Sequence, residues 1–180
     1  DRLATEFTID PRRTYAAGHS NGGFLAYRLA CELSDRIVAV GLQAGGLTVP
    51  TCTPTRPVSL LHVHGTADTN VPIDGGAGTG LSKVDFPPAL DSVTTVATAD
   101  GCAAGPVTTT DPSNADLTIS TWTPCAADTE VRFVTVAGAT HAYMGSTRAQ
   151  GAPADVGVPY AGLDVSLLIW QFLADHPRAG

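Results

Sequence analysis

The sequence predicts an α/β fold in which a mostly parallel sheet is covered by helices on both faces. Three short apolar runs, at residues 13–18, 36–41 and 58–64, have the length and composition of buried strands. Two longer segments, at residues 21–34 and 163–173, repeat apolar side chains every three or four positions, as amphipathic helices do. Because buried strands alternate with helices, the strands are expected to run parallel within one sheet.

Local patterns place the other elements along the chain. Leu3, Phe7 and Ile9 are spaced like the last turns of a helix that stops before Asp10, because the proline that follows disfavours a helical residue in front of it. In the closing helix, Trp170 is expected on the apolar side. The remaining expected elements are a long surface loop over residues 65–83, a helix over 88–99, strands over 117–122 and 131–136, and an irregular segment over 138–160.

Length and charge exclude several classes of protein. A chain of 180 residues has the size of one domain. Its 10 Lys and Arg against 17 Asp and Glu leave a net charge of −7, and a surface of that sign repels phosphate backbones and anionic lipids. No apolar run approaches the roughly 20 residues that cross a bilayer. We therefore expect neither a nucleic-acid partner nor a membrane partner.

The four cysteines, Cys31, Cys52, Cys102 and Cys125, favour an oxidising compartment. They form no CxxC pair, so their spacing fits neither a zinc site nor a redox motif. Four cysteines allow three pairings, of which we favour the sequential one, because it closes two short loops. Each bridge is then expected to stabilise the fold by about 3 kcal/mol. The alternative is four buried free thiols in a cytosolic protein.

The candidate nucleophile is Ser20, at the centre of the G-x-S-x-G pattern of residues 18–22. A predicted strand precedes this pattern and a predicted helix follows it directly, which is the arrangement of a nucleophile elbow. In such an elbow the serine adopts a strained conformation that lifts its hydroxyl above the sheet. Side chains at Gly18 or Gly22 are expected to collide where strand and helix approach, and the N–H of Asn21 is expected to face an oxyanion. The alternative is a glycine-rich turn with a capping serine.

A serine nucleophile needs a general base, and the base needs a carboxylate that orients it. Asp68 follows the strand predicted at 58–64, and His141 follows the strand predicted at 131–136. Both lie just past the carboxyl ends of strands, at the edge where such sheets bind ligands, and the order Ser, Asp, His is typical of doubly wound hydrolases. Asp74, in the same loop, is the main alternative to Asp68.

The other histidines are interpreted as structural. His62 and His64 are expected to be core histidines on opposite sides of a buried strand, and His19 is expected to point away from the nucleophile. Tyr143 and Met144 either line a pocket beside the base or pack in the core. No cluster of His, Cys and carboxylate residues suggests a metal site, so we expect neither a metal nor a cofactor. The aromatic residues interpreted as packing rather than substrate contacts are Trp122, Trp170 and Phe172.

With these residues in view, the chain resembles the secreted poly(3-hydroxybutyrate) depolymerase and feruloyl esterase-like branch of the α/β-hydrolases. In that family the serine, aspartate and histidine at these places form the catalytic triad, which implies this role for Ser20, Asp68 and His141. The family pattern also implies that Cys31 pairs with Cys52 and Cys102 with Cys125. The matching stretches are residues 9–15, 18–23, 29–31, 62–68 and 138–141.

The resemblance also implies further strands ahead of the nucleophile strand, one of which is followed by a loop with a second oxyanion donor. Ser20 stands too near Asp1 for these strands, and Asp1 is not a start methionine. We therefore expect residues 1–180 to be the C-terminal part of a single α/β-hydrolase catalytic domain, whose partner is an upstream segment of the same polypeptide. Without that segment, the chain is expected to be poorly soluble and nearly inactive.

The function predicted from these residues is that of a secreted, extracellular serine esterase that works through an acyl-enzyme. The candidate ester substrates are feruloyl or acetyl esters of plant polysaccharide, a polyester of the poly(3-hydroxybutyrate) type, and small aryl esters, and the sequence leaves this choice open. Two alternatives also remain open, a non-catalytic binding module on the same fold and a serine peptidase.

Overall fold

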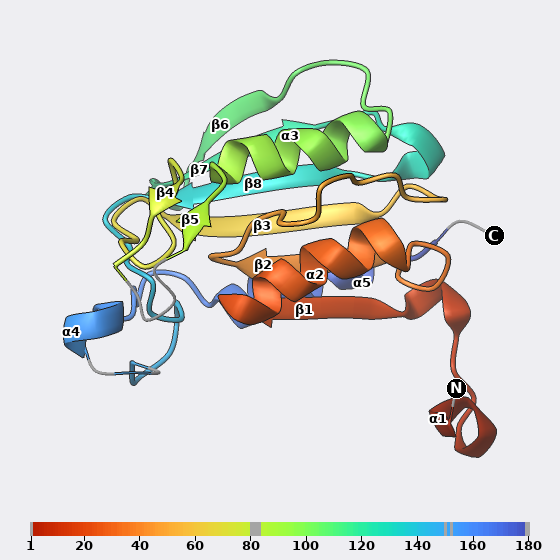
Figure 1. Cartoon of the computed structure of the whole chain (residues 1–180), viewed down its shortest axis with the longest axis horizontal. Helices are drawn as coiled ribbons and strands as arrows, with labels where there is room; N and C mark the ends of the chain where they lie inside the picture. The colour runs from red at the N-terminus through yellow and green to blue at the C-terminus, as the bar shows by residue number, and fades with distance from the viewer. Residues whose placement is uncertain (1, 80–83, 150, 152, 179–180) are drawn as a thin grey trace.

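The computed structural model describes residues 2–79, 84–149, 151 and 153–178, and its centre is a six-stranded sheet. The strands stand in the order β1-β2-β3-β8-β7-β6 (Figure 1). The first four strands of this order pair in parallel, whereas β8, β7 and β6 pair antiparallel. The bounds are β1 (Tyr15–His19), β2 (Ala39–Gln43), β3 (Ser59–Gly65), β6 (Val107–Asp111), β7 (Asn114–Trp122) and β8 (Val131–Val136).

Helices cover both faces of this sheet, as predicted. α2 (Asn21–Glu32) and α3 (Ala89–Ala99) lie on the face toward the viewer in Figure 1, and α5 (Val165–Asp175) lies behind the sheet. The core is divided in the same way: Leu60 packs in the cluster with α2 and α3, and its neighbour Leu61 packs in the cluster with α5. Successive side chains of a strand point to opposite faces, so β3 contributes to both clusters. None of the described helices is long and apolar enough to cross a membrane.

The structure confirms the α/β fold and adds to the six-stranded sheet one strand that was not expected from the sequence. Every strand expected from the sequence is present; β8 has the expected ends, and the ends of the others differ from expectation by up to three residues. The missed strand is β6, which carries three threonines and is mostly exposed. An edge strand of this kind needs no apolar run, because neither of its faces is fully buried.

Three smaller elements also differ from expectation. The helix expected to stop before Asp10 is α1 (Arg2–Glu6), which ends earlier and is followed by a 3-10 turn, η1 (Pro11–Arg13). The expected surface loop contains β4 (Gly76–Ala77), which pairs with β5 (Asp85–Phe86) just after that loop, and the expected irregular segment contains α4 (Pro153–Val156). Residues 80–83, 150 and 152 of those two segments lie outside the described residues. A second 3-10 turn, η2 (Ala126–Asp128), precedes β8.

Trp170 does not pack in the core. Its side chain is 61% exposed, so the expectation that it lies on the apolar side of α5 is wrong. The buried side of α5 is formed by Ile169 and its neighbours one turn away, and a helix residue points about 100° away from the residue before it. The packing interpretation is confirmed for Trp122 and Phe172, which are both buried.

The two predicted disulfides are both present. Cys31, in the last turn of α2, is bonded to Cys52 in the loop before β3, and Cys102, after α3, is bonded to Cys125, after β7. The sequential pairing is therefore confirmed. The bridged residues are 21 and 23 positions apart, and loops of that size are stabilised by about 3 kcal/mol each.

β1 forms one edge of the sheet, since among the described strands it pairs with β2 alone. Large apolar residues are exposed near this edge: Leu25 on α2, which packs against β1, Leu33 at the C-cap of α2, and Trp170 on α5, which lines a cavity together with Ala17 and Gly18 of β1. The expectation that further strands of the same polypeptide cover this edge stays a prediction.

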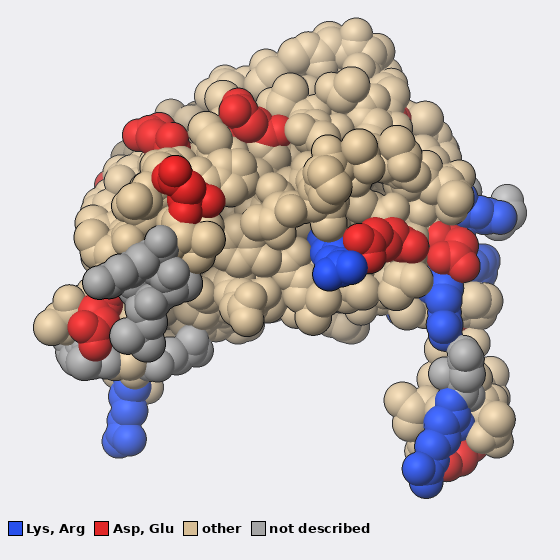
Figure 2. Space-filling view, in the orientation of Figure 1, with Lys and Arg blue, Asp and Glu red and all other residues tan. Residues whose placement is uncertain are grey.

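Figure 2 shows the charged side chains of the front face scattered around a broad uncharged area, so the acidic residues do not gather in one patch there.

A buried carboxyl stands at the amino end of β3. Asp100, directly after α3, accepts the N–H of Val58 at 3.1 and 3.3 Å through its two oxygens. Burial raises the pKa of Asp100 from 3.8 to about 7, although the hydrogen bond from Val58 lowers it. The folded state therefore holds this proton more tightly than the unfolded state does. The stability that this carboxyl contributes is full below pH 3.8 and is lost as the pH rises through about 7.

Replacing Asp100 by Asn is therefore expected to stabilise the protein at high pH. Above pH 7 the wild-type protein buries a carboxylate at a cost that approaches about 4 kcal/mol, whereas an amide is neutral at every pH. We expect D100N to raise the free energy of unfolding by about 1–3 kcal/mol at pH 8, because the amide N–H groups need partners of their own. At pH 4.5 no gain is expected. Urea unfolding at both pH values measures the difference, and an equal effect at both would contradict the raised pKa.

Candidate active site

The G-x-S-x-G segment forms a sharp turn between β1 and α2. Ser20 stands at this turn with φ 55° and ψ −120°, a conformation that costs an L-residue about 1–3 kcal/mol. A Cβ at Gly18 would lie 2.1 Å from the carbonyl oxygen of Gly22, so strand and helix approach too closely there for any side chain. The Ser20 N–H donates to the carbonyl of Gln43 on β2 at 3.0 Å. The strained strand-to-helix turn expected from the sequence is therefore present.

Gly22 does not have the role that the sequence analysis gave it. A Cβ at Gly22 would meet no atom within 4 Å, so the expectation that only hydrogen fits is wrong at this position. The close approach involves Gly23 instead, where a Cβ would lie 3.2 Å from the Cα of Gly45. The reason is helical geometry, since successive residues of a helix point about 100° apart and therefore face different neighbours.

Asp68 lies past the carboxyl end of β3, in a turn built around its carboxylate. Its Oδ1 accepts the backbone N–H groups of Asn70 and Val71, both at 2.9 Å. The residue is 4% exposed, so water contributes little to holding the carboxylate. The two N–H donors fix the direction of the group and leave Oδ2 to accept from another side chain.

The loops that carry Asp68 and His141 lie against each other. A Cβ at Gly65 would lie 2.2 Å from the carbonyl oxygen of Ala139, and the N–H of Ala67 donates to that same oxygen at 2.9 Å. Asp68 and His141 are 73 positions apart in the chain. Because β3 and β8 are neighbours in the sheet, their pairing brings the two loops to one place.

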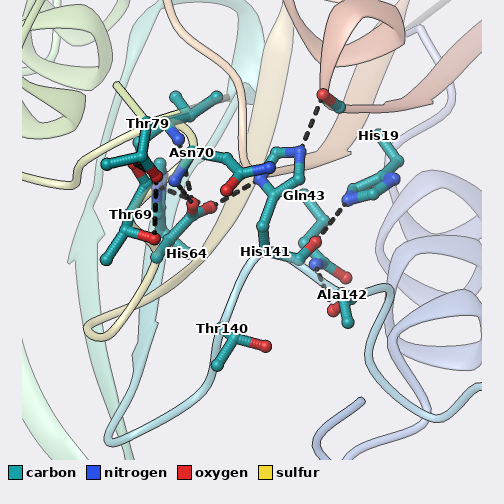
Figure 3. A network of polar contacts seen from close by, with 12 residues as sticks. His19, Gln43, His64, Thr69, Asn70, Thr79, Thr140, His141 and Ala142 are labelled. Carbon is teal, nitrogen blue, oxygen red and sulfur yellow. Dashed lines mark hydrogen bonds and ion pairs between the residues drawn. The ribbon is translucent and has the colours of Figure 1, made fainter. Parts of the chain in front are cut away.

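His141 connects the carboxylate to the serine (Figure 3). Its Nδ1 lies 2.8 Å from Asp68 Oδ2, and its Nε2 lies 2.8 Å from Ser20 Oγ. Since a carboxylate only accepts, Nδ1 carries the proton, and Nε2 is left to accept from the Ser20 hydroxyl. The structure thus brings together the three residues selected from the sequence, and Asp68, rather than Asp74, is the carboxylate against the imidazole.

Two residues that the sequence analysis did not select hold the backbone of the loop with His141. Gln43, at the end of β2, donates to the carbonyl of Ala142 at 3.1 Å and accepts the N–H of Met144 at 3.0 Å. His19 donates from Nε2 to the carbonyl of His141 at 2.9 Å (Figure 3). The sequence contains a signal for Gln43, because a polar residue at the end of a buried apolar strand needs polar partners.

His62 and His64 lie on the same face of β3, not on opposite faces as expected. His62 Nε2 lies 2.9 Å from His64 Nδ1. The error concerns periodicity, since side chains of a strand alternate with a period of two and residues i and i+2 share a face. Burial lowers the pKa of both imidazoles, so both are neutral. They are core histidines, as interpreted from the sequence.

The surroundings of the base answer the question left open for Tyr143 and Met144. Tyr143 lines a cavity together with His19 and Trp170, whereas Met144 is buried in the core cluster on the side of α5.

Asn21 is the first residue of α2, so its N–H stands at the helix N-terminus next to the serine. Within the part of the chain that the structure describes, no three His, Cys, Asp or Glu residues are grouped so as to hold a metal ion.

The chain shares sequence with proteins named as esterases. It is 29% identical over 147 residues to feruloyl esterase B of Piromyces equi and 32% identical over 76 residues to feruloyl esterase C of Emericella nidulans. These alignments cover 78% and 42% of this chain, and 27% and 28% of the two relatives. The chain therefore spans less than a third of the length of these relatives. No protein-family model matches the chain.

A solved structure has a similar fold. An acetyl xylan esterase from Aspergillus awamori aligns with a TM-score of 0.55 and 13% sequence identity, over 77% of this chain and 58% of that protein. This likeness concerns the fold and agrees with the α/β architecture predicted from the sequence. The sequence relatives confirm the resemblance on its feruloyl esterase side: over 78% of its length the chain is similar to a protein named feruloyl esterase B.

Proposed function

We propose that this chain provides the catalytic triad of a serine esterase, with Ser20 as nucleophile, His141 as general base and Asp68 as the orienting carboxylate. The observation that carries the proposal is the continuous line of contacts from Ser20 Oγ through both imidazole nitrogens to Asp68 Oδ2, each 2.8 Å long. Heavy-atom separations of about 2.6–3.2 Å are those that proton transfer requires. The chain order Ser, Asp, His also supports this assignment.

In the proposed reaction, Ser20 Oγ attacks the carbonyl carbon of an ester while its proton passes to His141 Nε2. Asp68, held by two backbone N–H groups, keeps the imidazole in the required tautomer and stabilises the imidazolium that forms. Nε2 then gives the proton to the leaving alcohol oxygen as the ester C–O bond breaks, and the acyl group stays on Ser20. A water molecule, deprotonated by the same imidazole, releases the acid and restores the serine hydroxyl.

The negative charge that develops on the carbonyl oxygen needs a hydrogen-bond donor. The N–H of Asn21 is our candidate, because it stands at the first position of α2, directly after the nucleophile. α2 is 12 residues long, and the positive end of its dipole lies at this terminus. Removal of one such donor in a well-studied protease costs about 10²–10³-fold in turnover, which is the scale of the contribution assigned to Asn21.

We infer that the substrates are carboxylic esters, with feruloyl or acetyl groups on plant polysaccharide as the candidates; a sequence relative is named as a feruloyl esterase, and a protein of similar fold as an acetyl xylan esterase. A polyester of the poly(3-hydroxybutyrate) type is a further candidate from the family resemblance. We also infer an extracellular location, since the two disulfides fit an oxidising compartment. The proposed steps use no metal and no cofactor.

The proposed function is tested with a panel of substrates offered to the natural polypeptide that carries this chain. The panel contains p-nitrophenyl acetate, methyl ferulate, acetylated xylan, a poly(3-hydroxybutyrate) suspension and a peptide p-nitroanilide. We expect hydrolysis of at least one ester and none of the anilide, because an alcohol leaves more readily than an amine. Hydrolysis of the anilide alone would indicate a peptidase, and binding of a substrate without turnover would indicate a binding module.

A further inference from the structure

Three buried polar side chains form a hydrogen-bonded series from α2 to the turn after β3. Tyr27 Oη lies 2.9 Å from His62 Nδ1, and His62 Nε2 lies 2.9 Å from His64 Nδ1. His64 Nε2 in turn lies 2.8 Å from the carbonyl oxygen of Val71. All three side chains belong to residues that are 0% exposed. This series, the Tyr27–His62–His64 chain, therefore crosses the core without contact with solvent.

The direction of every hydrogen bond in the Tyr27–His62–His64 chain follows from its last acceptor. Because the Val71 carbonyl can only accept, His64 Nε2 carries a proton. Burial lowers the pKa of His64, so the ring is neutral and its Nδ1 accepts from His62 Nε2. Burial also lowers the pKa of His62, which leaves His62 Nδ1 to accept from the Tyr27 hydroxyl. Each ring nitrogen is used, and one arrangement of protons satisfies the whole series.

The end of this series meets the turn that holds Asp68. Val71 accepts from His64 through its carbonyl and donates its N–H to Asp68 Oδ1 at 2.9 Å. The same His64 Nε2 lies 3.6 Å from Asp68 Oδ2, which is the oxygen that faces His141 (Figure 3). His64 therefore fixes the turn that binds one carboxylate oxygen and places the positive end of an N–H bond near the other oxygen.

The arrangement fits orientation rather than proton transfer. A carbonyl oxygen closes the series, and this group has no proton to pass on. Apolar side chains could fill the same volume without the desolvation cost of two imidazoles and a phenol. A buried polar network in which every member is satisfied makes the groups that it connects rigid. The group made rigid here is the turn of Asn70 and Val71 around the carboxylate of Asp68.

We propose that His64, held in place by His62 and Tyr27, is a positioning residue for Asp68. This inference rests on the proposed function, because it concerns the orienting carboxylate of the same site. Loss of the His64 donor frees the Val71 carbonyl, and the turn can then rotate the carboxylate away from His141 Nδ1. A misplacement of about 1 Å in a catalytic group costs on the order of 10²-fold in rate. Substrate binding is unaffected, since the three side chains are buried.

The test compares His64→Leu with His64→Gln in the natural polypeptide that carries this chain. Gln keeps an N–H donor near the place of Nε2, whereas Leu has a similar volume and no donor. Hydrolysis of p-nitrophenyl acetate is expressed per active site, counted by titration with a fluorophosphonate. We expect His64→Leu to lower kcat by about 10–100-fold with KM within about twofold, and His64→Gln to restore most of the loss. Tyr27→Phe, which removes only the distant hydroxyl, is expected to lower kcat by about 2–5-fold.

A merely structural role for the Tyr27–His62–His64 chain gives a different result. In that case a smaller fraction of each variant would react with the fluorophosphonate, and every active site that reacts would turn over at the wild-type kcat. This result would overturn the proposal. If His64→Leu does not fold, His64→Gln and Tyr27→Phe decide: a reduced kcat per titrated site in Tyr27→Phe supports the proposal, and a wild-type kcat contradicts it. If the fluorophosphonate reacts with Ser20 of the wild type and the His64 variants have the wild-type kcat, the positioning role alone is overturned. A wild type that does not react at Ser20 overturns the proposed function, and the positioning role with it.

Discussion

Replacing Ser20 by Ala is expected to lower ester hydrolysis by about 10⁴–10⁶-fold while the fold stays intact. Oγ is the attacking atom of the proposed reaction, and it lies 2.8 Å from the nitrogen that takes its proton. A methyl group in the same place has no lone pair with which to attack a carbonyl carbon. The steady-state rate with p-nitrophenyl acetate measures the loss, and circular dichroism checks the fold.

A matched control is Ser113→Ala, in the turn between β6 and β7. The Ser113 hydroxyl donates to Asp111 on the surface and has no part in the candidate site. This variant is expected to keep its rate within about twofold of the wild type, as surface substitutions of this kind usually do. If Ser20→Ala retained more than about one hundredth of the activity, the nucleophile would have to be another residue.

Gly18→Ala is expected to prevent the native packing of β1 against α2. The added Cβ would lie 2.1 Å from the carbonyl oxygen of Gly22 and 2.7 Å from the backbone nitrogen of Gly23, and neither atom belongs to a side chain that can move aside. Displacement of the helix start also displaces Ser20. We expect a loss of more than about 4 kcal/mol in the free energy of unfolding, which is a large part of the stability of a typical domain.

Gly22→Ala provides the comparison, because a Cβ there meets no atom within 4 Å. An alanine in the first turn of a helix also lowers the entropic cost of folding, so the free energy of unfolding is expected to stay within about 1 kcal/mol of the wild type or to rise. Thermal unfolding of the two variants side by side measures the contrast. Equal losses in both would show that the close approach at Gly18 does not exist in solution.

The three residues of the proposed triad could be selected from local patterns because parallel strands end at the same edge of a sheet. Asp68 and His141 each follow a buried strand, so their convergence follows from topology and needs no knowledge of distances. Ser20 is marked by the strand before it and the helix after it. In all three cases the pattern within about ten residues of the side chain carries the information.

The residues that support the triad could not be selected in this way. Gln43 bonds to Ala142, which is 99 positions away, and His64 reaches the turn of Asp68 through a carbonyl oxygen that any residue could provide. Contacts of this kind depend on which loops meet at the sheet edge. The position of Gln43 in the sequence signals that it needs polar partners, but no spacing in the sequence identifies those partners. Trp170 shows the same limit, since helical periodicity does not say whether a neighbour is present to bury the side chain.

The placement of His62 and His64 is a different case. A period of two alone places both rings on one face of β3, and the mutual contact at 2.9 Å follows from that rule. Strand β6 could be found only in the structure, because an exposed edge strand has no apolar run. The space for a side chain at Gly22 could also be found only there, because empty space around a glycine leaves no pattern in the sequence.

The most direct test of the proposed triad is fluorophosphonate labelling, followed by mass spectrometry of the digested protein. It measures which residue is labelled and whether the labelling rate depends on His141. We predict one label per molecule, on the peptide that contains Ser20. It also predicts that labelling in His141→Ala is slower by at least about 10³-fold, since a serine hydroxyl without its base is a poor nucleophile. A label on a different residue, or labelling of Ser20 at the wild-type rate in His141→Ala, would contradict the proposed relay of Ser20, His141 and Asp68.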